Sequence, residues 1–189
     1  MSCSFLDNYR IKKAVKIVQS GGVIIYPTEA VFGIGCDPKN LSALKKIVDI
    51  KSRDSKKGLI IVASSYEQIL GYINPIPKDI ENRLRTNWPG QTTYIFPANE
   101  MLSDYLIGGN NKTIAIRVSK NKYIKKLCDL LGHPLVSTSA NISGMESITS
   151  YKQAKEEFQN KVDYILPGKV DINLKPSKII DIFTSKVLR

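Results

Sequence analysis

Short apolar runs alternate with amphipathic segments along most of this chain, and no other feature restricts its fold as strongly. Runs such as 23–26 and 59–63 are almost entirely apolar, as expected of strands buried on both faces. Segments such as 9–20 and 122–131 instead carry apolar side chains at helical spacing. Strands that alternate with helices predict an α/β protein with a twisted, mixed sheet flanked by helices.

The same patterns give the expected bounds of each element. We expect helices over 9–20, 41–50, 78–86 and 122–131, and one capped by Thr149 that ends at Phe158. We expect strands over 23–26, 59–63, 93–96, 113–118, 162–166 and 179–182, and another that begins at Leu135. No repeat or Gly/Ser linker interrupts the series, so residues 1–189 are predicted to form one domain.

Composition restricts where such a protein works. Apolar residues make up 42% of the chain and charged residues 24%, which is typical of globular proteins. No apolar run approaches the roughly 20 residues that a membrane-spanning helix needs. The N-terminal residues lack the basic start and apolar core of a secretory signal. We therefore expect a cytoplasmic protein that does not contact a membrane.

Cysteine and histidine are too sparse for several common kinds of site. Cys3, Cys36 and Cys128 are widely separated, and His133 is the single histidine. This pattern predicts neither a structural zinc site nor a disulfide framework. His133 precedes Pro134 at the expected entrance of a strand, which favours a loop histidine over a catalytic one.

The formal net charge of +11 is large for 189 residues. It predicts attraction to polyanions, which include nucleotides, tRNA and other nucleic acids. Lysine-rich surfaces can also serve solubility alone. Much of the excess charge lies on expected helix faces, and we assign those side chains mainly to solvent: Lys12, Lys13, Lys45, Lys46, Lys125 and Lys126.

Hydroxyl and amide side chains are concentrated at 137–144, directly after the apolar residues 134–136. In α/β sheets, ligands usually bind at the ends of buried strands. Lys51 and Arg53 close an expected helix, and Lys57 precedes a strand, so three cations could neutralise a polyanion near a sheet edge. Two simpler interpretations remain open: a Ser/Thr/Asn turn, and cations that favour a helix C-terminus.

Residues 26–36 form a second candidate binding segment. Pro27 fixes the backbone there, while Gly33 and Gly35 allow the main chain to approach a ligand closely. The segment is neither a Rossmann fingerprint nor a Walker loop. Further along, Arg117 is a lone charge inside an apolar strand. A buried arginine needs a partner, which could be a protein carboxylate or a substrate carboxylate.

Taken together, the motifs resemble one family. Those that carry the resemblance are Tyr26-Pro27-Thr28-Glu29-Ala30-Val31-Phe32-Gly33, Lys51-x-Arg53, Lys57-Gly58-Leu59-Ile60, Trp88-Pro89-Gly90, Ala115-Ile116-Arg117-Val118 and Ser137-Thr138-Ser139-Ala140-Asn141-x-Ser143-Gly144. In this order they are similar to the YrdC/TsaC family, in its bacterial single-domain form, over residues 9–189. The resemblance implies a nucleotidyltransferase that makes threonylcarbamoyl-AMP and pyrophosphate from L-threonine, bicarbonate or CO2, and ATP.

The resemblance also implies roles for individual residues. The phosphates would meet Lys51, Arg53 and Lys57, and the nucleotide or the carbamate would meet Thr113, Ser139, Asn141 and Thr149. Threonine would be held by Thr28, Arg117 and Ser177, with Arg117 on its carboxylate, and Arg189 would approach the nucleotide. Ser137 and Thr138 are given structural roles. Catalysis would rest on positioning and charge neutralisation, without a protein nucleophile. Mg2+ would arrive with ATP rather than at a dedicated protein site.

The implied product serves the N6-threonylcarbamoyladenosine (t6A) modification of tRNA. The implied partners are therefore tRNA and the downstream tRNA threonylcarbamoyltransferase proteins TsaB, TsaD and TsaE. Two residues depart from the family pattern: Gln91 and Asp54 each replace a usual proline. The alternative function is a module that binds double-stranded RNA or tRNA, for example in rRNA maturation. A weaker alternative is carbamoyl transfer in hydrogenase maturation, which the lack of zinc-finger and acylphosphatase-like segments disfavours.

Overall fold

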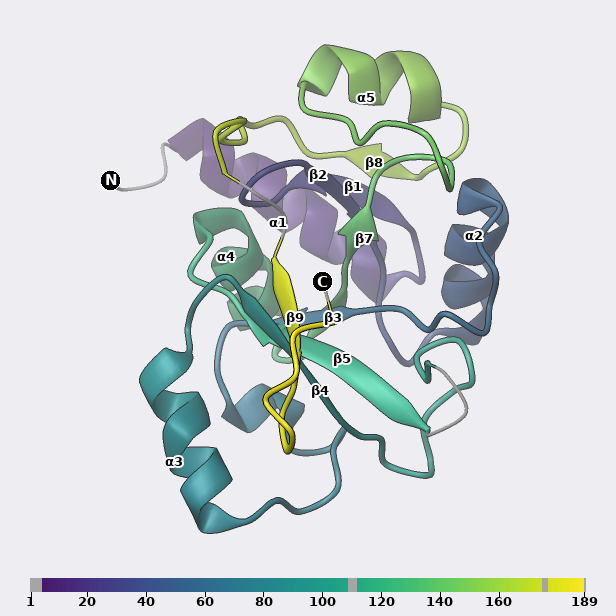
Figure 1. Ribbon diagram of the computed structural model, residues 1–189. Helices are drawn as coiled ribbons and strands as arrows, with labels where there is room; N and C mark the ends of the chain where they lie inside the picture. Colours follow the sequence, from purple (N-terminus) through teal and green to yellow (C-terminus); the bar gives the residue numbers. More distant parts are fainter. Residues whose placement is uncertain (1–4, 109–111, 175–176, 189) are drawn as a thin grey trace.

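The structure is a computed structural model that describes residues 5–108, 112–174 and 177–188 (Figure 1). Its helices are α1 (Phe5–Gln19), α2 (Leu41–Lys51), α3 (Lys78–Asn87), α4 (Lys122–Leu131) and α5 (Tyr151–Phe158), with a short 3-10 helix at Glu67–Ile69. Its strands are β1 (Ile24–Pro27), β2 (Phe32–Gly35), β3 (Ile61–Ala63), β4 (Thr92–Pro97), β5 (Thr113–Val118), β6 (Leu135–Val136), β7 (Thr138–Ser139), β8 (Tyr164–Ile165) and β9 (Lys178–Asp181).

The predicted α/β class with mixed strand directions is confirmed, but the strands form two sheets. The smaller sheet has the order β7-β2-β1-β8, and the larger has the order β6-β3-β5-β4-β9. Each contains parallel and antiparallel pairs: β1 is antiparallel to β2 and parallel to β8, and β5 is antiparallel to β4 and parallel to β3. The helices lie around these sheets, with α1 beside α4 and with α3 and α5 at opposite ends of the view in Figure 1.

Most expected elements occur close to their expected bounds, and the exceptions have local causes. Helix α1 begins at Phe5 rather than at Tyr9. Helix α5 is capped by Ser150 rather than Thr149, because the Ser150 hydroxyl accepts from the Gln153 amide in a capping box. Strands β2 and β7 were not expected. Two glycines lower the strand propensity of β2, and β7 spans only two residues.

The two sheets meet where the chain passes from β6 to β7. Strand β6 pairs with β3 in the larger sheet, and β7 pairs with β2 in the smaller one. At this junction the Val136 amide donates to the Cys36 carbonyl at 3.0 Å. A Cβ on Gly35 would lie 2.0 Å from the Val136 carbonyl oxygen. Gly35 is therefore required for the contact between strands, not for the ligand approach expected from sequence.

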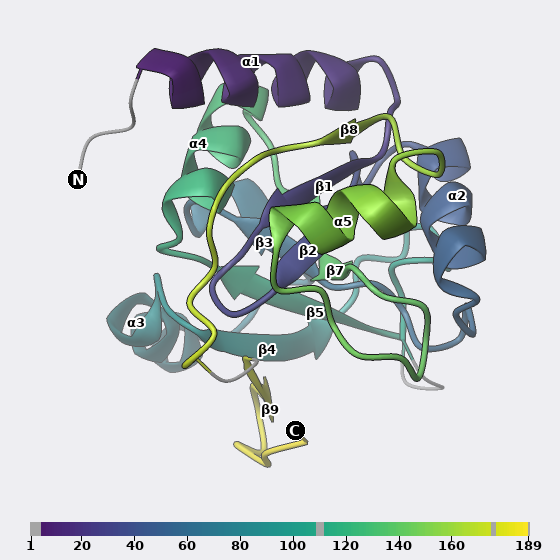
Figure 2. The ribbon, with the colours of Figure 1, turned by 90° about the horizontal axis from the view of Figure 1, so that it is seen from above.

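Strand β1 is buried on both faces, which explains its continuous apolar sequence. Ile25 belongs to a core cluster that includes residues of α2 and of the larger sheet. Ile24 and Tyr26 belong to a second cluster with residues of α1 and α4, the helices that lie side by side in Figures 1 and 2. Burial on both sides fixes the position of the turn that follows β1.

Several sequence expectations concern single residues or simple features. Cys36 and Cys128 are buried free thiols, and Cys3 lies outside the described residues. In the described part of the chain, no helix combines the length and the apolar character needed to cross a bilayer. Five of the six lysines assigned to solvent are exposed: Lys12, Lys13, Lys45, Lys125 and Lys126. Lys46 is half-buried, and its ammonium pairs with Asp163 Oδ2 at 2.8 Å.

Candidate functional site

A cleft of about 330 Å³ lies between the larger sheet and the turn after β1. Alternate residues of the sheet point into it, because successive side chains of a strand face opposite ways. The cleft is lined from β4 and its approach by Thr93, Ile95 and Gln91, from β5 by Ala115 and Arg117, and from β9 and its approach by Ile179 and Ser177. The facing wall is formed by residues 28–31, Gly33, residues 137–139 and Ser147, together with Arg53, Lys57 and Ile60.

The cleft contains a buried ion pair. Arg117 Nη2 lies 3.1 Å from Glu29 Oε2, and both side chains are about 10% exposed. The Ser119 hydroxyl donates to Glu29 Oε1 at 2.6 Å. The sequence left open whether Arg117 pairs with a protein carboxylate or with a substrate carboxylate. Arg117 does pair with a protein carboxylate, that of Glu29, and it also lines the cleft.

The same cleft is also lined by hydroxyl side chains. Thr28 Oγ1 donates to the Val31 carbonyl at 2.6 Å, which fixes the turn after β1. Across the cleft, Thr93 Oγ1 donates to Ser177 Oγ at 3.0 Å. The three residues predicted to hold threonine, Thr28, Arg117 and Ser177, therefore line the same cleft although they are far apart in sequence.

Two of the predicted phosphate-binding cations also line the cleft. Arg53 Nη2 donates to the Gly58 carbonyl at 2.9 Å, and this bond holds the guanidinium against the loop before β3. Lys57 is exposed and reaches the cleft from the same loop. Asp54 is exposed, and its side chain accepts from the Lys56 amide within a turn. Of the two departures from the family pattern, Gln91 lines the cleft and Asp54 does not.

Lys51 lies behind the cleft wall and is only 2% exposed. Its ammonium donates to the Ser139 carbonyl, to the Asn141 carbonyl at 2.7 Å and to Asn141 Oδ1 at 3.2 Å. Its own carbonyl accepts from the Ser143 amide at 2.8 Å. Lys51 therefore anchors the loop 139–143 from two directions, rather than presenting its charge to the cleft.

Asn141 completes this anchor and is 8% exposed. Its Oδ1 also accepts from the Ser139 hydroxyl at 2.6 Å, and its Nδ2 donates to the carbonyls of Ile142 and Met145. Of the pair predicted to contact nucleotide, Ser139 lines the cleft and Asn141 shapes the loop that carries it. Burial, followed by the neighbouring Arg53, lowers the pKa of Lys51 to about 8.

Loss of the Lys51 ammonium should loosen this loop and slow turnover. We expect Lys51→Met to lower kcat by about 10- to 100-fold, since small displacements of positioning groups have effects of this size. The exposed Lys45 on the same helix is the matched control, and Lys45→Met should leave kcat unchanged.

Protonated Lys51 has a donor for each of its three acceptors. The wild-type advantage over Lys51→Met should therefore shrink as pH rises through about 8. A ratio of the two kcat values that stays constant across this pH range would contradict the anchor.

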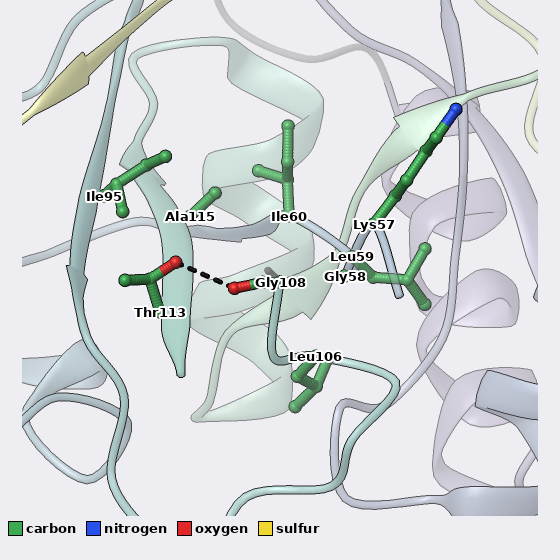
Figure 3. Close-up of a pocket in the computed structure, with 9 residues that line it drawn as sticks. All are labelled: Lys57, Gly58, Leu59, Ile60, Ile95, Leu106, Gly108, Thr113 and Ala115. Carbon is green, nitrogen blue, oxygen red and sulfur yellow. Dashed lines mark hydrogen bonds between the residues drawn. The ribbon is translucent and has the colours of Figure 1, made fainter. Parts of the chain in front are cut away.

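A second cavity, of about 270 Å³, adjoins the cleft (Figure 3). Both cavities are lined by Lys57, Ile60, Ile95 and Ala115, so they are direct neighbours, and we refer to the two together as the groove. Leu59 and Leu106 make the second cavity more apolar. Thr113 lies at its edge, with its hydroxyl directed to the Gly108 carbonyl at 3.0 Å.

A further residue assigned from sequence lies away from both cavities. Thr149 is exposed beside the start of α5, outside the residues that line either cavity. Arg189 lies outside the described residues. Conversely, Ser137 and Thr138, which were given structural roles, line the cleft. Glu29 was not assigned a role. It is an acidic residue in an apolar segment, and for that reason it was a candidate for the carboxylate partner that a buried Arg117 requires.

The described residues include no group of three or more His, Cys, Asp or Glu side chains that could hold a metal ion. His133 Nδ1 lies 2.7 Å from the Pro134 carbonyl, in the bend between α4 and β6, and the residue is not among those that line the cleft. The loop position predicted for this histidine is confirmed. The predictions that catalysis needs no protein nucleophile and no protein-built metal site stay predictions.

Fold and cleft together define a class of protein. It is a mixed α/β protein whose cleft is lined by a buried Arg–Glu pair, by hydroxyl side chains and by two further cationic side chains, Arg53 and Lys57. The Sua5/YciO/YrdC family model, described as "Telomere recombination", matches residues 16–189, and the chain belongs to this family. The resemblance seen in the sequence motifs is confirmed. A Vibrio parahaemolyticus protein named threonylcarbamoyl-AMP synthase is 40% identical over 187 residues, which cover 97% of this chain and 99% of that protein. A Nitrosococcus oceani protein of the same name is 40% identical over 189 residues, the full length of both.

Solved structures agree with this assignment. The structure of P. abyssi Sua5 complexed with L-threonine matches with a TM-score of 0.87 and 31% identity, over 96% of this chain and 54% of that one. The chain thus spans about half of the length of P. abyssi Sua5. E. coli YciO matches with a TM-score of 0.81 and 27% identity, over 96% of this chain and 89% of that one.

Proposed function

We propose that the protein is a threonylcarbamoyl-AMP synthase, which joins L-threonine, bicarbonate or CO2, and ATP into threonylcarbamoyl-AMP and pyrophosphate. The observation that carries the proposal is the composition of the groove. Buried Arg117 and the hydroxyls of Thr28 and Ser177 lie in one cleft with Arg53 and Lys57. A carboxylate-binding arginine beside two cations suits an amino acid held next to a polyphosphate. The names of the full-length bacterial relatives support the same reaction.

The proposed substrates divide the groove between them. L-threonine occupies the part lined by Thr28, Arg117 and Ser177, with its carboxylate toward Arg117. The phosphates of MgATP lie toward Arg53 and Lys57, and the magnesium ion arrives as part of that substrate. The nucleoside extends into the adjoining cavity, whose apolar walls and Thr113 hydroxyl suit a base and its ribose. Lys57 lines both cavities, so it lies where the two parts of the nucleotide would meet.

The chemistry requires positioning more than a reactive side chain. The threonine amine adds to CO2 and loses a proton, and a carbamate oxygen then attacks the α-phosphorus while pyrophosphate leaves. Carbamates decompose in water, so the intermediate must form close to ATP. A groove that holds both substrates makes the second step effectively intramolecular. Arg53 and Lys57 would offset the negative charge that accumulates on the leaving pyrophosphate.

tRNA and the downstream threonylcarbamoyltransferase proteins are proposed as partners, since they would use the product. The formal net charge of +11 would attract the phosphate backbone of an RNA. The cytoplasm, where ATP and tRNA are abundant, is the proposed location.

The proposed reaction is tested with the purified protein. Pyrophosphate release should require MgATP, L-threonine and bicarbonate together, and label from bicarbonate should appear in a product with the mass of threonylcarbamoyl-AMP. The omission of threonine or bicarbonate should reduce release to background. Pyrophosphate release that does not depend on threonine would overturn the assignment. RNA binding without any such release would favour the alternative of an RNA-binding module.

A further inference from the structure

The Arg117–Glu29 pair leaves two polar atoms unused. In the described part of the chain, Arg117 Nε and Glu29 Oε2 are buried and have no hydrogen-bond partner, although Arg117 Nη2 lies 3.1 Å from Oε2. Buried polar groups in proteins are nearly always hydrogen-bonded, so such orphans call for an explanation. Here one orphan is a cationic donor and the other an anionic acceptor, and both belong to residues that line the cleft.

These two atoms are complementary to an α-amino acid. Its carboxylate accepts hydrogen bonds, its ammonium donates them, and the two groups are attached to the same carbon. A guanidinium beside a carboxylate offers the complementary groups: the guanidinium can donate to the carboxylate of the amino acid, and the carboxylate can accept from its ammonium. Ser119 Oγ occupies the other oxygen of Glu29, with a bond of 2.6 Å. That bond fixes the carboxylate and leaves Oε2 as the acceptor nearest to Arg117.

We propose that Glu29 binds the α-amino group of the amino-acid substrate, while Arg117 binds its carboxylate. Glu29 is then a specificity-determining residue of the site. This inference rests on the proposed function and adds to it a second contact for the substrate. It explains why a carboxylate lies in a cleft that otherwise attracts anions: Glu29 favours a zwitterion over a simple carboxylic acid.

A purely structural ion pair would behave differently. If Glu29 only held Arg117 in place, its removal would weaken every ligand that carries a carboxylate. If Glu29 binds the amino group, Glu29→Gln should weaken binding of the zwitterion. The same substitution should leave binding of an amine-free acid equal or tighter, because Arg117 then lacks its internal counter-charge. The two interpretations therefore differ for the amine-free acid: its binding weakens if Glu29 is only structural, and it is equal or tighter if Glu29 binds the amino group.

The experiment measures binding by calorimetry without ATP. The ligands are L-threonine and its hydroxy-acid analogue, in which a hydroxyl replaces the α-amino group. Wild-type protein should prefer L-threonine by about 10- to 100-fold, the range expected for one charge-assisted hydrogen bond. Glu29→Gln should abolish or reverse that preference. Glu157→Gln, the same substitution on an exposed residue of α5, is the matched control and should retain the preference.

Each outcome decides the question. Equal wild-type affinity for the two ligands overturns the inference without any variant, so the test survives if Glu29→Gln does not fold. A Glu29→Gln protein that binds both ligands more weakly and keeps the preference also overturns it. If the wild type releases threonine-dependent pyrophosphate in either case, the proposed function stands and only the role of Glu29 falls. If the wild type binds no threonine and releases no such pyrophosphate, both fall.

Discussion

Replacement of Arg117 with methionine is expected to lower kcat/KM for L-threonine by about 100-fold or more, while KM for ATP stays near its wild-type value. The size follows from truncation of one partner of a buried charge pair, which typically costs about 2–5 kcal/mol of binding free energy. Arg117 is 9% exposed, so water competes little with a substrate carboxylate for its guanidinium. Initial rates of pyrophosphate release at saturating ATP and bicarbonate, with threonine varied, give the value.

A second variant separates lost binding from lost stability. Arg117→Met leaves the Glu29 carboxylate buried without its cation, which should lower the free energy of unfolding by about 3–5 kcal/mol. The double variant Arg117→Met/Glu29→Gln buries no charge at this position, so most of that stability should return. Its activity should not return. Recovery of threonine-dependent turnover in the double variant would contradict a direct role for Arg117 in substrate binding.

The sequence predicted the elements whose own periodicity is strong. Helix α4 matches its expected bounds because its four most buried residues, 123, 124, 127 and 128, repeat at helical spacing. Strand β2 was missed because pairing with β1 and β7, rather than local propensity, holds two of its four residues as extended glycines. Two sheets instead of one could not be foreseen, since the division depends on which strands pair across long stretches of sequence.

The site divides in a similar way. Residue types and the family resemblance together predicted the charges and hydroxyls of the groove, and Thr28, Arg53, Lys57, Arg117, Ser139 and Ser177 line it. Sequence could not show whether a residue faces the cleft or is buried behind the residues that line it. Lys51 and Arg53 are two positions apart, yet the left-handed backbone of Ser52 ends α2 between them. As a result Lys51 is buried against loop 139–143, while Arg53 lines the cleft. Glu29 was left without a role although the sequence placed an acidic residue in the apolar segment after β1; the folded chain shows that it is the partner of Arg117.

Substitution of Gly35 by alanine is expected to destabilise the whole protein, because its methyl group would lie 2.0 Å from the Val136 carbonyl oxygen. The obstacle is backbone, which cannot rotate away as a side chain would. Overpacking of a core typically costs about 1–3 kcal/mol, and we expect a value at or above the upper end. In a protein of this size, a loss of about 3 kcal/mol lowers the melting temperature by about 6–12 °C.

The same substitution should also impair the site, since Gly35 holds the strand that leads into residues 137–139. Displacement of β6 from β2 moves the wall that carries Ser139, so kcat should fall even at temperatures where Gly35→Ala remains folded. Gly71→Ala is the matched control, because its Cβ would meet no atom within 4 Å. There we expect a change of no more than about 1 kcal/mol, of either sign. Equal melting temperatures for the two variants would show that the sheets can separate at β2 and β6 at little cost, contrary to the tight contact at Gly35.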